Sequence, residues 1–148
     1  MKFIPEQTNF IYDGMPLFSQ NNLYFEPLHK CDAVVNFGDW SLEVNVDSER
    51  KTLVSLEGMF NKKSVMEKEL TIPVAENAVI HVDDVKELMN ISYAKWKKYY
   101  DKDKGWFCFG DINAQGTGYC FATNTIAVIF QNDLKAIYVK PNFLDEMT

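Results

Sequence analysis

The chain is poor in cysteine and lacks the cysteine spacings that organise crosslinked or metal-bound folds. Its 148 residues contain three cysteines, Cys31, Cys108 and Cys120, and no two of them are separated by two residues. An odd number without CxxC spacing argues against a disulfide framework. We therefore expect a fold held by its apolar core and a protein of the reducing cytoplasm.

Long apolar runs are also absent. No segment approaches the ~20 apolar residues that span a bilayer. The opening residues MKFIPEQTNF contain one lysine but no apolar stretch of the kind that a secretion signal requires. We expect neither a membrane segment nor a signal peptide.

Positive charge is in deficit, with 15 Lys and Arg against 21 Asp and Glu, a formal net charge of −6 and a pI of about 4.9. Nucleic-acid binding needs a positive surface that replaces counterions, so we expect no nucleic-acid partner. The lysines of residues 95–104 alternate with Asp101 and Asp103, which indicates a solvated helix end. An acidic protein suits a basic partner.

The loops carry no complete ligand-binding motif. The glycines of residues 110–118 do not form GxGxxG, and no Lys-Ser/Thr pair follows as a P-loop requires. Residues 101–105 begin like a calcium loop, but Gly105 and Ile112 occupy the fifth and twelfth positions, where ligands should stand. The sequence therefore predicts no metal site and no cofactor.

The candidate nucleophiles have a structural explanation. Cys108 lies between Phe107 and Phe109 in an apolar strand pattern, as Cys120 does between Tyr119 and Phe121, and such cysteines are usually small core residues. Neither His29 nor His81 belongs to a recognisable ligand or base motif. We expect no catalytic residues, and the sequence leans against an enzyme.

Apolar residues are plentiful: they make up 47% of the chain, and aromatic residues make up 14%. That is enough for one folded domain over residues 1–148. Residues 1–31 lack a regular period but carry many rings. We expect them to form an extended N-terminal arm packed on a sheet.

Strand signals dominate two regions. Residues 33–57 alternate apolar and polar side chains around the turns Gly38-Asp39 and 48–51, which predicts a three-stranded antiparallel meander. Trp106 to Phe109 is apolar on both alternating faces, which predicts a central strand. Strands then follow over residues 119–140, with a tight turn at Asn132-Asp133.

A helix is predicted over about residues 83–100. Asp84 and Glu87 form a capping-box-like pair, and apolar residues recur at helical spacing. The fold class expected is α+β, an antiparallel, strongly curved sheet of six to nine strands with this one helix packed on it. The residues on the expected helix face are Val85, Leu88, Met89, Ser92, Trp96 and Tyr99.

Tyrosines mixed with carboxylates can form a recognition surface. Tyr93, Tyr100, Tyr119 and Tyr138 do not fit one core face. We place the expected partner surface at the loop of residues 111–118 and the turn of residues 101–104. The candidate binding residues are Tyr100, Asp101, Asp103, Asp111 and Tyr119.

The run Trp106-Phe107-Cys108-Phe109-Gly110-Asp111, followed by residues 125–141, resembles the small bacterial immunity proteins of polymorphic toxin systems. The resemblance covers about a quarter of the chain. It implies a cytoplasmic protein that neutralises one cognate toxin by covering its active site or a nearby surface. An acidic surface suits a basic nuclease domain. These families share no catalytic signature, so no site residue is transferred.

Two other roles stay open. A small-molecule-binding or enzymatic domain would place a pocket between sheet and helix, lined by Trp40, Trp96 and Trp106. A structural subunit would self-associate through a sheet edge. The oligomeric state is not determined by the sequence.

Overall fold

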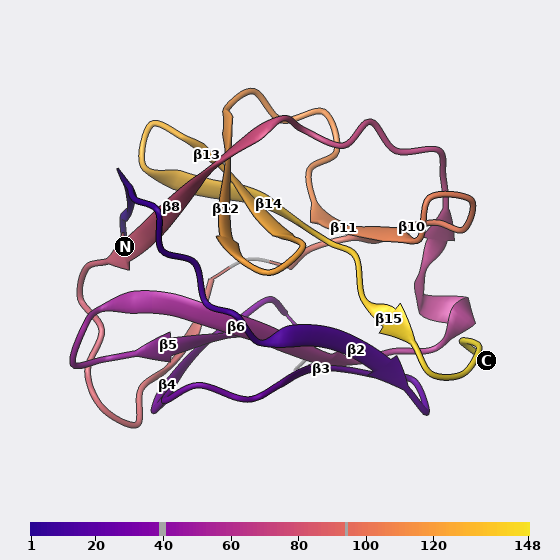
Figure 1. The fold of residues 1–148 in the computed structure, drawn as a ribbon, viewed down its shortest axis with the longest axis horizontal. Coiled ribbons are helices and arrows are strands. Elements are labelled where there is room, and N and C mark those ends of the chain that lie inside the picture. The colour runs from indigo at the N-terminus through magenta and orange to yellow at the C-terminus, as the bar shows by residue number, and fades with distance from the viewer. Residues whose placement is uncertain (39–40, 94) are drawn as a thin grey trace.

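The computed structural model of the protein describes residues 1–38, 41–93 and 95–148. It shows one curled, mixed β-sheet folded into two layers (Figure 1). The lower layer contains β2 (Met15–Ser19), β3 (Asn22–Glu26), β4 (Ala33–Asn36), β5 (Leu42–Asp47) and β6 (Thr52–Met59).

The upper layer contains β8 (Ala75–Val82), β10 (Lys98–Asp101), β11 (Trp106–Gly110), β12 (Thr117–Ala122), β13 (Thr125–Phe130) and β14 (Asp133–Val139). Short elements lie at the margins: β1 (Phe3–Gln7), the 3-10 turn η1 (Lys62–Ser64), β7 (Met66–Glu67), β9 (Asn90–Ser92) and β15 (Asn142–Phe143).

Strand β8 joins the two layers. Residues 75–77 pair with β12 in the upper layer, and residues 78–82 pair with β1. His81 also pairs with Thr52 of β6 in the lower layer. At the opposite side the sheet stays open, because its path of paired strands begins at β15 and ends at β7.

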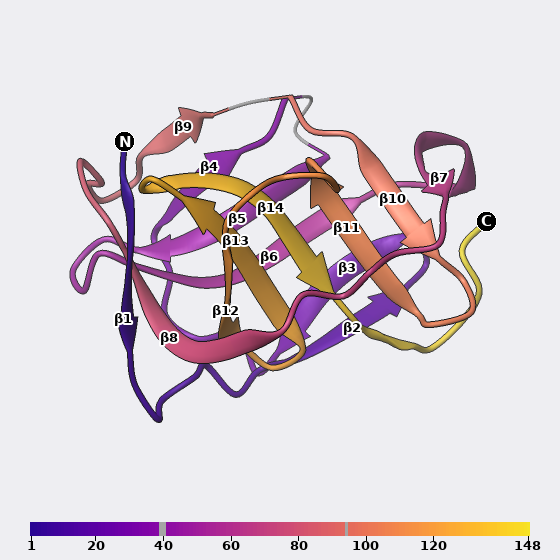
Figure 2. The ribbon, with the colours of Figure 1, turned by 90° about the horizontal axis from the view of Figure 1, so that it is seen from above.

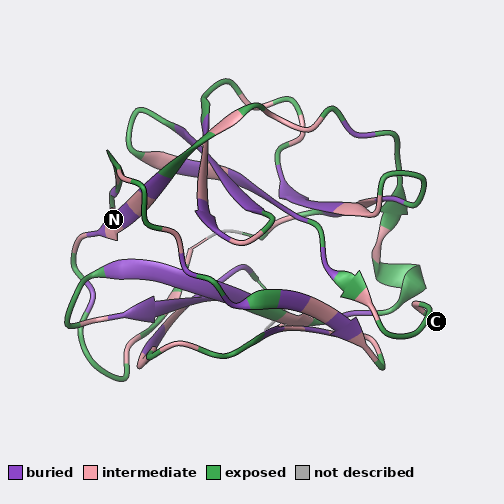
Figure 3. Cartoon of the chain, in the orientation of Figure 1, coloured by how far each residue is buried: buried purple, intermediate pink, exposed green. Residues whose placement is uncertain are grey.

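Two apolar cores stabilise this arrangement. The larger lies between the layers and is rich in rings, with Phe18, Phe107 and Phe109 fully buried. The smaller lies on the far side of the upper layer, where Leu70 packs with Cys108 and Tyr138. The segment between β7 and β8 crosses over this side (Figure 2). Figure 3 shows buried residues on the strands of both layers and exposed ones in the loops.

The expected helix is wrong, and with it the α+β class. Among the described residues of 83–100, β9 pairs with β4, and β10 lies between β11 and β7, so the segment supplies one edge strand and one strand paired on both sides. Asp84 and Leu88 have φ of +58° and +60°, which an α-helix does not accept. Asp84 therefore cannot act as a cap. Residue 94 lies outside the described residues.

Tertiary pairing explains this failure. Backbone groups at a sheet edge need partners, and strands β9 and β10 supply them to β4 and β11. The segment also carries aromatic and β-branched side chains, such as Ile91, Tyr99 and Tyr100, that suit a pleated surface. Apolar residues do recur at helical spacing in this segment, but Leu88, which belongs to the expected buried face, is 84% exposed.

The sheet also differs from the expected six to nine antiparallel strands. Over the described residues it has 15 strands, and four of their pairs are parallel: β4–β9, β7–β10, β8–β12 and β2–β15. Residues 1–31 do not form a separate irregular arm, because β1, β2 and β3 are hydrogen-bonded members of the sheet.

The structure confirms several of the predicted strands. The antiparallel pairing of β4, β5 and β6 confirms the meander over residues 33–57, although Asp39 of its first turn lies outside the described residues. Strand β11 is bonded on both sides, by β10 and β14, which confirms a central strand. The last hairpin turns at Gln131-Asn132, both with positive φ, one residue earlier than expected.

Candidate functional site

The side of the lower layer turned away from the core, here called the outer face, is the best candidate for a binding site. Cross-strand partners in a sheet point to the same side. Asn36 of β4 pairs with Glu43 of β5, and Glu43 pairs with Glu57 of β6. Tyr24 of β3 lines a hollow of about 310 Å³ together with Glu43 and Glu57. A polar row thus crosses four strands.

Glu43 and Glu57, here called the carboxylate pair, are an unfavourable combination. Like charges directly opposite on neighbouring strands destabilise a sheet. The pKa of Glu43 is raised above its ordinary range, first by burial, then by the charge of Glu57 and by a hydrogen bond with it. Burial and the neighbouring acidic group thus both disfavour the ionised form of Glu43.

A register shift produces this pair. Asp47 pairs with Thr52 and Val46 with Leu53, a register that would place Glu43 opposite Leu56. The ladder shifts by one residue between Asn45 and Val46, and Glu43 meets Glu57 instead. Bulges of this kind re-aim side chains and concentrate near functional sites.

Asn36 extends the row with a second unusual group. The residue is 2% exposed, and its Oδ1 is buried with no hydrogen-bond partner among residues 1–38, 41–93 and 95–148. Buried polar atoms are rarely left unpaired. In the neighbouring row of the same face, by contrast, Asn45 Nδ2 donates to Ser55 Oγ at 3.0 Å.

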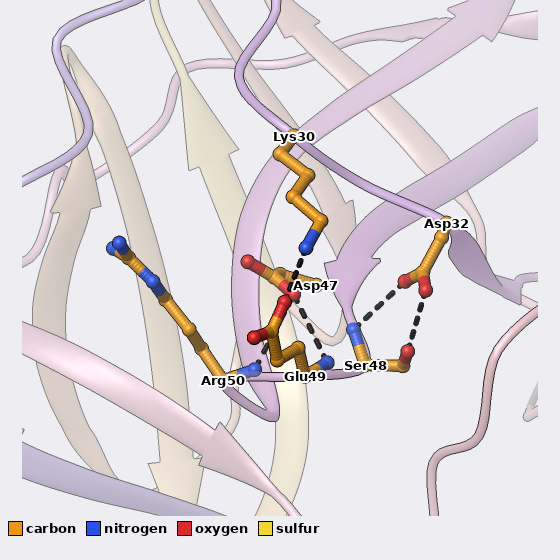
Figure 4. A network of polar contacts seen from close by, with 6 residues as sticks. All are labelled: Lys30, Asp32, Asp47, Ser48, Glu49 and Arg50. Carbon is orange, nitrogen blue, oxygen red and sulfur yellow. Dashed lines mark hydrogen bonds and ion pairs between the residues drawn. The ribbon is translucent and has the colours of Figure 1, made fainter.

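Ion pairs and turn hydrogen bonds hold the edge of the outer face (Figure 4). Asp32 Oδ1 and Oδ2 accept from Ser48 N and Oγ at 2.8 and 2.6 Å, and the pKa of Asp32 is lowered chiefly by these bonds. Asp47 accepts from the backbone of Glu49 at 3.0 Å. Lys30 pairs with Glu49, which raises the pKa of Lys30. Lys30 is therefore already occupied by an acidic partner.

Exposed apolar side chains border the acidic row. Met59 is 66% exposed, and Met15 is 36% exposed across from Glu26. The outward positions of the described strands β2 to β6 contain no lysine or arginine. They include Met15, Leu17, Ser19, Asn22, Tyr24, Glu26, Val34, Asn36, Glu43, Asn45, Ser55, Glu57 and Met59.

A second hollow lies where the two ends of the sheet face each other, and it is called the seam groove. It has a volume of about 560 Å³, with Tyr100, Phe143 and Met147 among its apolar lining. Tyr100 stacks on Phe107 at 4.7 Å between ring centroids, and Phe143 lies 5.6 Å from Tyr100. Charges of both signs ring it: Lys62, Glu67, Lys102, Asp145 and Glu146.

The structure brings together three of the five sequence-predicted binding residues. Tyr100, Asp101 and Asp103 line one hollow beside the seam groove. Asp111 follows β11 at the other end of its ladder with β10, because Asp101 pairs with Trp106. Tyr119 lies on β12, opposite Ala127. The predicted five therefore do not form one surface.

Asp101 serves the fold. It is 4% exposed, and its carboxylate accepts backbone N–H groups of Leu70, Asp103 and Lys104 at 2.9–3.1 Å. These bonds, with that from Leu70 the strongest, lower the pKa of Asp101. Asp103, by contrast, is exposed.

Replacing Asp101 with asparagine is expected to lower the melting temperature by several degrees at pH 7. The native pKa lies below the ordinary value of about 3.9, so the ionised carboxylate stabilises the fold above that pH and stops doing so as pH falls through the native pKa. Thermal melts at pH 7, 5 and 3 test this. The difference from wild type should shrink at pH 3, whereas exposed Asp103→Asn should change little throughout. A constant difference would contradict the role of the charge.

The cysteines and tryptophans do not build a reactive site. Burial raises the pKa of Cys108 to about 12 and raises that of Cys120, so both thiols stay protonated at neutral pH. Trp96 stacks on Phe37 at 3.9 Å between ring centroids and packs on the larger core, between the layers. Trp106 packs on the smaller core, on the far side of the upper layer. Trp40 lies outside the described residues, so the expected pocket of three tryptophans gains no support.

Sequence reasoning missed Tyr24, Glu43 and Glu57. The sequence does place Glu43 and Glu57 at polar positions of the alternating pattern, on two strands joined by a hairpin. That signal was insufficient, because the pairing depends on the bulge at Asn45.

Among the described residues, no three His, Cys, Asp or Glu side chains are grouped to hold a metal ion. Within the same residues, no helix is long and apolar enough to cross a membrane. No protein-family model matches the chain, and a search of curated proteins finds no significant match.

Proposed function

We propose that the protein is a non-catalytic binding protein of the bacterial cytoplasm that neutralises a cognate basic toxin domain by direct contact, as an immunity protein does. The observation that carries this proposal is the outer face. It combines three outward carboxylates, Glu26, Glu43 and Glu57, with exposed Met59 and half-exposed Tyr24, and holds no cation at its outward positions.

Such a face suits a basic protein surface for two reasons. Complementary charge steers association and selects the partner. Tyrosine and methionine are enriched in interfaces relative to the rest of the protein surface. The binding cleft of a nuclease toxin is basic, so an acidic sheet face can cover it and exclude the nucleic acid.

The test is capture from the protein's own cells followed by a toxicity assay. The captured protein, expressed alone, should arrest growth, and co-expression of this chain should restore it. A Tyr24→Ala chain, first shown to be folded by its melting curve, should restore growth less well. Capture of metabolites alone, or of a partner that is harmless when expressed, would reject the proposal.

The seam groove favours a second candidate, binding of a small molecule. Its volume of about 560 Å³ falls within the range of ligand sites, and its floor is aromatic. Native mass spectrometry of the purified chain distinguishes the two. A retained metabolite that is lost in a Tyr100→Ala variant would support this candidate.

A further inference from the structure

The carboxylate pair and its neighbours present hydrogen-bond acceptors in excess of donors. Glu43 and Glu57 lie directly opposite one another, and Asn36 lies directly opposite Glu43 on the other side. The Oδ1 of Asn36 has no hydrogen-bond partner in the part of the chain that the structure describes. Lys30, at the edge of the outer face, is bound to Glu49. A ligand that supplies several N–H donors and a positive charge would satisfy this row.

We propose that the carboxylate pair is the receptor for an arginine side chain of a basic partner protein, with Tyr24 and Asn36 bounding the site. The inference rests on the proposed function and names the chemistry by which the outer face would select its partner. The hollow of about 310 Å³ at Tyr24, Glu43 and Glu57 gives the side chain a place to enter.

Arginine fits this site better than lysine does. Opposed side chains on neighbouring strands have Cβ atoms about 5 Å apart, so one planar guanidinium can bridge both carboxylates. Its five N–H donors lie in a fixed fork that matches carboxylate oxygens. A lysine ammonium offers three donors at a single point. The ring of Tyr24 also provides a face on which a guanidinium stacks.

Binding should be coupled to proton release. The pKa of Glu43 is raised in the free protein by burial and then by Glu57, and a guanidinium beside its carboxylate would favour the ionised form. The groups that surround the pair are Tyr24 from β3, Asn36 from β4 and, before β4, Cys31, whose own pKa is raised by burial and then by Glu57, Asp32 and Asp47. Affinity should therefore fall as the pH is lowered toward the ordinary glutamate pKa of about 4.3.

The probes are tetra-arginine amide and tetra-lysine amide, titrated into the full chain and followed by the side-chain carboxyl NMR signals. Tetra-arginine should shift the signals of Glu43 and Glu57 first and should bind at least about fivefold more tightly than tetra-lysine. With tetra-arginine bound, the titration midpoint of Glu43 should move to lower pH. The double variant Glu43→Gln/Glu57→Gln should lose about tenfold in affinity.

The matched control is Glu69→Gln/Glu87→Gln, which removes the same charge from two exposed residues of other segments. Equal loss in both double variants, or equal affinity for the two peptides, would overturn the inference in favour of unspecific charge attraction. A stronger shift of the Glu43 signal with Ca²⁺ than with tetra-arginine would overturn it in favour of a metal ion. The peptide titration involves no toxin, so its outcome is independent of the growth assay. The chain can restore growth without preferring arginine, and it can prefer arginine without restoring growth.

Discussion

Replacing Phe107 with alanine is expected to lower the free energy of unfolding by about 3–5 kcal/mol. Phe107 is fully buried at the middle of β11. Its ring contacts rings from separate parts of the chain: Phe18 of β2 at 5.7 Å, Phe60 at 5.2 Å, Tyr100 of β10 at 4.7 Å and Phe143 of β15 at 5.9 Å between centroids. Its removal would leave a cavity where the two ends of the sheet meet.

Urea denaturation measures this loss as a lower midpoint at unchanged slope. Phe130→Ala in the same layer is the matched control, because its ring is 37% exposed and should cost far less. Trp106 begins the same strand but is only half-buried, so its substitution should also cost less than that of Phe107. A loss under about 1 kcal/mol for Phe107→Ala would contradict the position of its ring at the centre of the core.

The difference between Trp106 and Phe107 illustrates what a sequence pattern determines. The double-sided apolar run from Trp106 to Phe109 located the central strand correctly. The run could not tell which ring lies at the junction of β2, β10 and β15, because those contacts join residues distant in the sequence. Local alternation determines a strand, whereas its depth in the core depends on which strands lie against it.

The failed helix has the same origin. The spacing of Val85, Leu88 and Trp96 satisfied a helical period, yet the hydrogen bonds of β9 and β10 are made to strands β4 and β11. Helical stability in proteins depends more on tertiary packing than on propensity. The unpaired backbone groups of β4 and β11 therefore compete successfully with helix formation for such a segment.

The candidate site was hidden for a more local reason. The alternation of the sequence places Glu43 and Glu57 at solvent-facing positions of their strands. Only the register shift beside Asn45 puts them opposite each other. The predicted carboxylates Asp101 and Asp103 were conspicuous because they cluster in sequence. The structure shows that Asp101 caps a turn, so its clustering has a structural cause.

Replacing Glu57 with lysine is expected to change stability and binding in opposite directions. The substitution would turn a like-charge cross-strand pair into an opposite-charge pair, and we expect the free energy of unfolding to rise by about 0.5–1 kcal/mol at pH 7. The gain should shrink as the pH falls through the pKa of Glu43, because a protonated carboxyl carries no charge for the lysine to attract. Binding of the basic partner proposed above should weaken at least about 100-fold, or about 2.7 kcal/mol, because its guanidinium would meet a like charge.

Urea melts of the chain and calorimetric titration with the captured toxin measure the two effects. Glu69→Lys, on an exposed residue outside the outer face, is the control and should change neither quantity appreciably. A destabilised Glu57→Lys chain that still binds the toxin would show that the carboxylate pair is a structural feature. A stabilised chain that no longer binds would show that the fold keeps an unfavourable pair for its partner, since functional sites often carry interactions that stability alone would remove.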